Sequence, residues 1–261
     1  MCLIALSWRS HPRYVLALAA NRDEFHARAT APAEFWPEAP HVLAGRDLEA
    51  GGTWLGITRT GRVAALSNYR DGEPRPGPRS RGELVRDFLL GTAAPRAYAR
   101  DVDAGGGAYG GFNLLIGEIG TALYYVNNRG APVQALTRAV HGVSNGHLDA
   151  PWPKVRRLCA ALEALPAERA AAEAGLFHAL ADRTRAPDAQ LPDTGVGIER
   201  ERRLSPAFIA DPVYGTRAST VILVGVDGRV SFTERRFGPG GVRMGETRRG
   251  FALEQTTDEE M

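Results

Sequence analysis

One of the two cysteines of this chain, Cys2, directly follows the initiator methionine in the opening stretch MCLIAL. A cysteine there is poorly placed for a disulfide, but removal of the methionine would give it both a thiol and a free α-amine. An α-amine has a pKa of about 7.7–8.0, so near neutral pH part of it can accept a proton. The thiolate is the attacking form of cysteine, and a neighbouring cation increases its population. The position of Cys2 therefore predicts one residue that supplies nucleophile and base together.

The stretch NRDE, with three charged residues directly behind an apolar run, is the second candidate for chemistry. The apolar runs 2–8 and 14–20 are separated by RSHPR, and they predict an antiparallel hairpin with its turn centred near residue 11. This pairing sets Cys2 opposite about residue 20. The NRDE residues are therefore expected just beyond the second strand, beside the start of the chain.

The types of residue in NRDE suit a cysteine nucleophile. Arg22 is expected to lower the pKa of the Cys2 thiol, and Asp23 is expected to hydrogen-bond the α-ammonium and orient it. The alternative is that Cys2 is a small apolar strand residue and that NRDE is a solvated turn with incidental ion pairs.

The remaining pattern predicts strands toward both ends of the chain and helices between them, an α+β fold with helices packed on sheets. Ser80, with Glu83 three residues later, forms a capping-box pattern, so a helix is expected to begin there. The proline- and glycine-rich segment 70–80 is expected to be a loop, either a cover over an active site or a linker. Further strands are predicted over 53–58, 62–69, 112–117, 122–127, 139–144, 219–226, 229–235 and 247–254. Further helices are predicted over 94–103, within 151–165 and over 167–183, and residues 185–216 are expected to be mostly irregular.

Composition narrows the class of protein. The chain has 261 residues and a net charge of +2, and Lys154 is the single lysine among 32 basic residues, which argues against nucleic-acid binding. Two cysteines, Cys2 and Cys159, are too few for a disulfide framework and fit a reducing compartment. No apolar run approaches the roughly 20 residues of a membrane span, and no secretory signal is present. We expect a cytoplasmic protein without membrane insertion. The six histidines show no metal-ligand spacing, so no metal site is expected.

Six stretches in order along the chain carry a family resemblance. They are MCLIALSW, LALAANRDEF, GGTWLGITRTGRVAALSNYR, GFNLLIG, HGVSNG with DAPWPK, and YGTRASTVILV with GRVSFTERRF. Together they resemble the NRDE family, also called the transport and Golgi organisation protein 2 family, from residue 1 to about 236. That family is in turn similar to N-terminal nucleophile hydrolases of the cholylglycine hydrolase and penicillin V acylase group. The resemblance implies a single domain over 1–261 with a four-layer αββα sandwich.

The same resemblance implies roles for particular residues. Cys2 matches the nucleophile and Arg22 the arginine beside it. Asp23 matches the catalytic aspartate, although the hydrolases usually insert residues between the arginine and the aspartate. Asn68 and Asn145 match two asparagines that contact the oxyanion. Arg217 matches an arginine late in the chain of those enzymes. The alternative for Asn68 and Asn145 is that they are turn residues, and the alternative for Arg217 is a structural role or an ion pair with Asp23 or Glu24.

Two functions follow from the resemblance. The first is an amidohydrolase that acts on a small-molecule amide or acyl substrate and requires no cofactor. The second is a non-catalytic carrier of a hydrophobic ligand, because the family has been linked to haem trafficking and to acyl-CoA or lipid metabolism. Haem would then be a transported ligand. The sequence names neither the substrate nor the oligomeric state.

Overall fold

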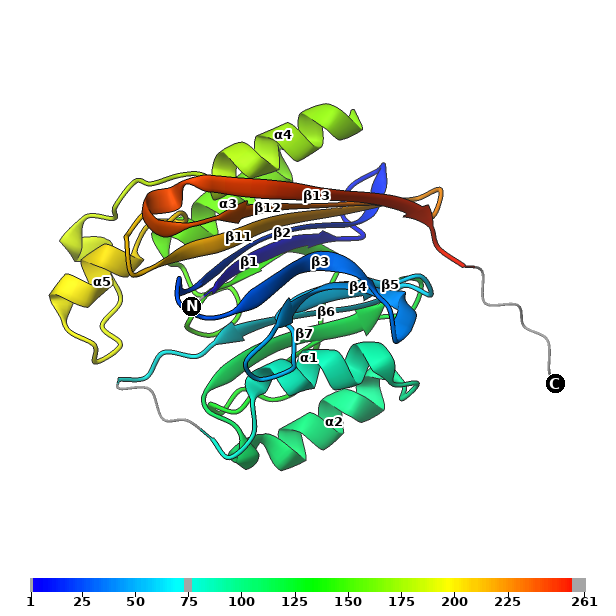
Figure 1. The fold of residues 1–261 in the computed structure, drawn as a ribbon, viewed down its shortest axis with the longest axis horizontal. Coiled ribbons are helices and arrows are strands. Elements are labelled where there is room, and N and C mark those ends of the chain that lie inside the picture. Colours follow the sequence, from blue (N-terminus) through cyan, green and yellow to red (C-terminus); the bar gives the residue numbers. More distant parts are fainter. Residues whose placement is uncertain (1, 73–76, 255–261) are drawn as a thin grey trace.

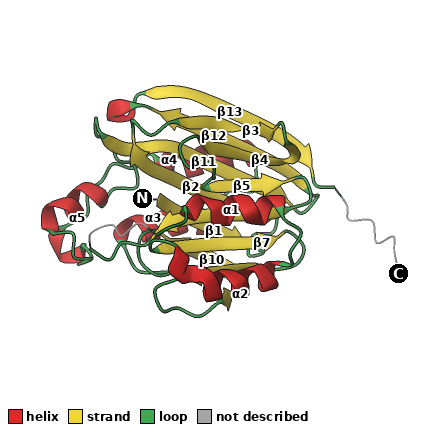
Figure 2. Cartoon of the chain, turned by 60° about the horizontal axis from the view of Figure 1, so that its bottom comes forward, coloured by secondary structure: helices red, strands yellow, loops and turns green. Residues whose placement is uncertain are grey.

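Two antiparallel β-sheets stack face to face at the centre of the molecule, and helices cover the outer face of each sheet (Figure 1). The computed structural model describes residues 2–72 and 77–254. Helices α3 (Pro153–Glu163) and α4 (Arg169–Leu180) pack on one sheet, and α1 (Arg81–Leu90) and α2 (Pro95–Gly105) pack on the other. The arrangement is the predicted four-layer αββα sandwich, with the strands enclosed between helices (Figure 2).

The first sheet has six strands in the order β10-β1-β2-β11-β12-β13. Its strands are β1 (Cys2–Trp8), β2 (Tyr14–Phe25), β10 (Ala139–Val143), β11 (Tyr214–Gly225), β12 (Arg229–Phe237) and β13 (Arg243–Ala252). The second sheet has seven strands in simple sequence order from β3 to β9. Its strands are β3 (Thr30–Trp36), β4 (Ala39–Asp47), β5 (Leu55–Thr58), β6 (Arg62–Asn68), β7 (Phe112–Glu118), β8 (Leu123–Asn127) and β9 (Gln134–Ala135).

Strand β1 shows why the opening run is almost continuously apolar. Successive side chains of a strand point to opposite faces of the sheet. Ile4, Leu6 and Trp8 join the core between the two sheets, whereas Leu3 and Ala5 join the core under α3 and α4. Because both faces of the sheet are covered, β1 is apolar apart from Ser7, whose hydroxyl is hydrogen-bonded to that of Ser10.

The β1–β2 hairpin forms as predicted, but its register and length differ. Cys2 lies opposite Arg22, two residues further along than expected, so the turn is centred on residue 12 rather than 11. The backbone N–H of Arg9 donates to the Val15 carbonyl and extends this register into the turn. Strand β2 continues through NRDE to Phe25 instead of ending at residue 20, because β11 pairs with it on its other side along the whole length.

The predicted start of α1 is confirmed. Ser80 accepts a hydrogen bond from the Gly82 backbone, and the Glu83 side chain accepts one from the Ser80 backbone, which is a complete capping box. Of the predicted loop 70–80, residues 73–76 lie outside the described residues.

Two regions differ from the sequence prediction. Residues 26–52, for which no element was predicted, contribute β3 and β4. The segment predicted to be irregular, 185–216, contains helix α5 (Ile198–Leu204) and the start of β11. Short 3-10 turns complete the fold: η1 (Gly106–Ala108), η2 (Asp188–Gln190) and η3 (Pro239–Gly241).

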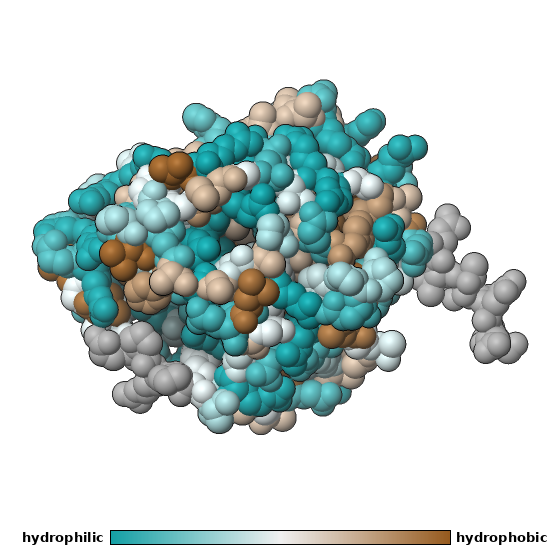
Figure 3. All heavy atoms as spheres, viewed as in Figure 1, coloured by the Kyte–Doolittle hydropathy of each residue, from teal (hydrophilic) through white to brown (hydrophobic). Residues whose placement is uncertain are grey.

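The surface is largely hydrophilic on the face shown in Figure 3, with small separate hydrophobic patches. Phe25, Val213 and Met244 are among the large apolar side chains exposed to solvent. Within the ranges 2–72 and 77–254, no helix combines the length and the apolar character needed to cross a bilayer.

Candidate active site

The end of β1 and the extension of β2 bring Cys2 and the NRDE stretch together inside the molecule. Cys2 is buried and pairs with Arg22 in the sheet register. Arg22 is 6% exposed and Asp23 is 1% exposed. The alternative of a solvated turn is therefore wrong, because these charged groups lie in the interior next to the cysteine.

Arg22 is held against an aromatic ring beside Cys2. Its guanidinium carbon lies 4.3 Å from the centre of the Trp54 ring, and its Nη1 donates to Thr30 Oγ1 at 3.4 Å. Arg22 and Trp54 also line a recess at Cys2. The remaining lining of this recess is Ile4, Ala20, Asn21, Leu55, Leu66 and Thr220. The recess therefore combines an apolar wall with one fixed cation at the sulfur.

Asp23 is fixed by the neighbouring strand β11. Thr216 Oγ1 donates to Asp23 Oδ1 at 2.7 Å, and the Tyr214 hydroxyl donates to the Asp23 carbonyl at 3.0 Å. Burial raises the pKa of the Asp23 carboxyl, while the positive charge of Lys154 and the bond from Thr216 act in the opposite direction. The carboxylate is thus held by β11, close enough to Cys2 for the two groups to interact electrostatically.

Lys154 is a site residue that sequence reasoning missed. It lies at the start of α3, is 2% exposed, and donates from Nζ to the Leu204 carbonyl at 2.9 Å. Burial lowers the pKa of Lys154 to about 8, against the opposing charges of Asp23 and Cys2. The sequence gives one hint, which is that Lys154 is the single lysine among arginines. Because an arginine at this position could not lose its proton, a lysine there indicates a group that can titrate.

The acidity of Cys2 differs from the prediction. Burial raises the pKa of the Cys2 thiol, and the opposing effects of Arg22 and of a hydrogen bond from the Asp23 backbone do not reverse that rise. Arg81, at the start of α1, is a further cation that interacts with Cys2 through space. Arg22, Arg81 and Lys154 thus interact electrostatically with Cys2, but burial is the largest effect and the pKa of the thiol stays above its ordinary value.

The two predicted asparagines lie at the ends of strands that belong to different sheets, and a hydrogen bond joins them. Asn145 follows β10 and is fully buried, and its Nδ2 donates to the carbonyl of Asn68 at the end of β6 at 2.8 Å. Ser144 ties this pair to the nucleophile, because its Oγ donates to the Cys2 carbonyl at 2.9 Å. One N–H of the Asn145 amide remains after the bond to Asn68.

Arg217 occupies a bulge in β11 between Thr216 and Ala218. Its Nη1 donates to the carbonyls of Phe25 and Arg28 at 2.8 and 3.0 Å, so the side chain holds the turn that follows β2. Burial lowers its pKa, and repulsion from Arg22 adds to this effect.

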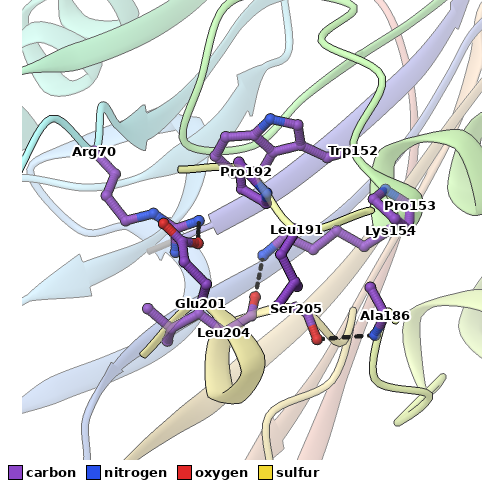
Figure 4. Close-up of a pocket in the computed structure, with 10 residues that line it drawn as sticks. All are labelled: Arg70, Trp152, Pro153, Lys154, Ala186, Leu191, Pro192, Glu201, Leu204 and Ser205. Carbon is purple, nitrogen blue, oxygen red and sulfur yellow. Dashed lines mark hydrogen bonds and ion pairs between the residues drawn. The ribbon is translucent and has the colours of Figure 1, made fainter. Parts of the chain in front are cut away.

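A second recess is lined by Lys154 (Figure 4). A buried ion pair crosses it, from Arg70 Nη2 to Glu201 Oε2 at 2.7 Å. The Arg70 guanidinium carbon also lies 5.0 Å from the centre of the Trp152 ring. Helix α5 is thereby fastened to the segment that follows Asn68. Metal-ligating clusters of three or more side chains are absent from the part of the chain that the structure describes.

Comparisons with known proteins show which family this chain belongs to. The family model for Transport and Golgi organisation 2 matches residues 1–239. The chain is 38% identical over 258 residues to the human Transport and Golgi organization protein 2 homolog, which covers 90% of this chain and 92% of that protein. It is 39% identical over 259 residues to the homolog from Bos taurus, with coverage of 90% and 92%.

One solved structure shows the same fold. A Caenorhabditis elegans ortholog of N-acylethanolamine-hydrolyzing acid amidase superposes with a TM-score of 0.52, over 85% of this chain and 92% of that chain. The two sequences are 14% identical, so the likeness concerns the fold alone, which is that of the N-terminal nucleophile hydrolases.

Proposed function

This chain belongs to the Transport and Golgi organisation 2 family, and we propose that it is an N-terminal nucleophile hydrolase that cleaves an amide or acyl bond with Cys2. One observation carries the proposal: Arg22 lies directly opposite Cys2 on the neighbouring strand, and the adjacent Asp23 is buried. A thiol, a cation and an oriented carboxylate in one dry place are costly unless they serve chemistry.

The proposed reaction begins after removal of Met1. The α-amine of Cys2 accepts the thiol proton, and the thiolate sulfur attacks the substrate carbonyl carbon. Asp23 orients the resulting α-ammonium, and Arg22 balances negative charge at the sulfur. The amides of Asn68 and Asn145 donate to the oxyanion of the tetrahedral intermediate, a contribution worth about 2.7–4 kcal/mol per donor in a well-studied enzyme.

The intermediate then collapses to a thioester. The carbon–nitrogen bond breaks, and the leaving amine takes the proton held by the α-ammonium. Water next attacks the thioester carbonyl and gives a proton to the α-amine, and that proton returns to sulfur as the acid leaves. Burial raises the pKa of the Cys2 thiol, so the neutral thiol is favoured before the reaction begins.

The test compares three proteins of verified mass: the wild type, Cys2→Ala and the matched control Cys159→Ala. We expect the mass to show loss of Met1 in the wild type. In a screen of amides, esters and thioesters, we expect turnover by the wild type and by Cys159→Ala, and none by Cys2→Ala.

Two outcomes would contradict the proposal. Retention of Met1 would block the amine. Binding of haem or an acyl-CoA without turnover, equally strong in wild type and Cys2→Ala, would support the carrier function instead.

A further inference from the structure

Asn113, in the GFNLLIG stretch, lies at the centre of a buried group of polar residues that the proposed reaction does not use. It is on β7 and is 1% exposed. Its Nδ2 lies 2.9 Å from the Gly146 carbonyl, 3.3 Å from the Ser144 carbonyl and 3.2 Å from Ser67 Oγ. One amide of the second sheet therefore contacts the backbone on both sides of Asn145, which follows β10 of the first sheet.

The direction of these hydrogen bonds is determined. The backbone N–H groups of Arg129 and Ala131 donate to Asn127 Oδ1 at 2.8 and 3.2 Å, so the Asn127 amide cannot be reversed without losing both. Asn127 Nδ2 donates to the Tyr125 hydroxyl at 2.7 Å, and that hydroxyl donates to Asn113 Oδ1 at 2.7 Å. The NH2 group of Asn113 must consequently face the carbonyls of residues 144 and 146.

Hydrogen bonds connect residues 144–146 to Cys2. Ser67 Oγ also donates to the Ser144 carbonyl, and Ser144 Oγ donates to the Cys2 carbonyl. Asn145, between the two carbonyls that Asn113 contacts, reaches across to Asn68. Any displacement of residues 144–146 would thus move the Asn145 amide relative to the Cys2 sulfur.

We infer that Asn113 is a positioning residue, which holds residues 144–146 so that the Asn145 amide meets the oxyanion formed on a carbonyl attacked by Cys2. The inference rests on the proposed function of the Cys2 site. Asn113 does not contact the substrate, and it acts through the backbone of its neighbours.

The test uses two reagents at Cys2. Iodoacetamide alkylates the thiolate by displacing iodide and forms no oxyanion. A p-nitrophenyl ester acylates it through a tetrahedral oxyanion, with loss of p-nitrophenolate. The ratio of the acylation rate to the alkylation rate therefore reports oxyanion stabilisation and is insensitive to a general loss of thiol reactivity.

Asn113→Asp keeps the shape but presents an acceptor oxygen to two carbonyls. We expect the ratio to fall at least tenfold, because removal of one oxyanion donor costs about 10²–10³ in rate in a well-studied enzyme. Tyr125→Phe removes one hydroxyl without leaving a large cavity, and we expect a fall of a few-fold. Tyr98→Phe is the matched control: its hydroxyl donates to the Leu84 carbonyl at 2.8 Å under α1, and its loss should leave the ratio unchanged.

Amide hydrogen exchange gives a second readout that is independent of chemistry. The Arg70 N–H donates to the Asn145 carbonyl at 2.8 Å, so we expect its exchange to accelerate about tenfold in Asn113→Asp and not in Tyr98→Phe. An unchanged ratio with unchanged exchange, or an equal fall of both reaction rates in Asn113→Asp and Tyr125→Phe, would overturn the inference. Failure of the wild-type protein to acylate at Cys2, with the expected exchange in the variants, would instead refute the proposed function and leave the positioning of Asn145 in place.

Discussion

At the scale of single residues, the environment of Lys154 has a measurable effect on stability. The folded pKa of about 8 lies below the ordinary 10.5, so between these values the native protein releases a proton that the unfolded chain keeps. Stability rises with pH wherever the unfolded state binds more protons. We expect the free energy of unfolding of the wild type to rise relative to Lys154→Met by roughly 3 kcal/mol between pH 7.5 and 11.

Urea titrations of both proteins across this pH range measure the difference, in which the titration of other groups cancels. Below pH 7.5 the two curves should run parallel. A constant difference up to pH 11 would mean that Lys154 titrates as in the unfolded chain.

The two cysteines should differ in reactivity toward iodoacetamide. Burial raises the pKa of both thiols. At Cys159 it reaches about 12, with Asp149 and Glu163 acting in the same direction, whereas at Cys2 the positive charge of Arg22 acts against the rise. At pH 8 we expect Cys2 to alkylate at least tenfold faster than Cys159, measured by peptide mass spectrometry.

Arg22→Gln should slow alkylation of Cys2 several-fold, because it removes the cation stacked on Trp54. Arg9→Gln is the matched control, since Arg9 stacks on Trp8 with its guanidinium carbon 4.6 Å from the ring centre, at the other end of β1. Equal effects of the two substitutions would contradict a specific role for Arg22.

Which site residues the sequence reveals depends on how far apart they lie in the chain. The proximity of Cys2, Arg22 and Asp23 follows from one short hairpin, so it could be predicted. Lys154 and Asn113 reach the site through contacts between separate layers, which no local pattern encodes. The raised pKa of Cys2 was also unpredictable, because it depends on how deeply the completed sandwich buries the sulfur.

At the scale of elements, the capping box of α1 should contribute measurably to stability. Ser80→Ala removes the acceptor for the Gly82 N–H, and loss of such a cap costs about 1 kcal/mol. Glu83→Gln retains an oxygen for the Ser80 N–H and should cost less. Thermal unfolding of the two variants checks the order, and a larger loss for Glu83→Gln would be inconsistent with it.

The elements that could be predicted are those with local signals. Strand β1 has an almost continuous apolar run and the start of α1 has a cap, whereas β3 and β4 carry Pro32 and Pro40, which indicate breaks in a strand pattern. Strand β2 runs on through polar residues only because β11 supplies partners for them. Helix α5 is a short element in a proline-rich segment, and tertiary contacts such as the Arg70–Glu201 pair hold it.

At the scale of the whole molecule, that ion pair fastens the region of α5 to the rest of the protein. Removing one partner of a buried pair costs about 3–5 kcal/mol because the other charge is left alone. We expect Glu201→Gln to destabilise the protein by about this amount. Glu201→Gln combined with Arg70→Met should cost less than Glu201→Gln alone, since no uncompensated charge remains.

Denaturant titration of the two singles and the double measures this coupling. The exposed pair Arg202–Asp188 provides the control, and Asp188→Asn should change stability little. Additive effects at Arg70 and Glu201 would show that the two charges do not depend on each other.

Lys154 is the single lysine of the chain and is buried at the start of α3, so cleavage after lysine measures how often this region opens. An endoproteinase that cleaves only after lysine has one target, the Lys154–Val155 bond, and the native packing shields it. Digestion would therefore yield two fragments at a rate set by how often α3 separates from the sheet beneath it. A bound ligand that keeps α3 packed on the sheet would slow this cleavage. The assay therefore detects binding without a label and for a ligand of any chemical class.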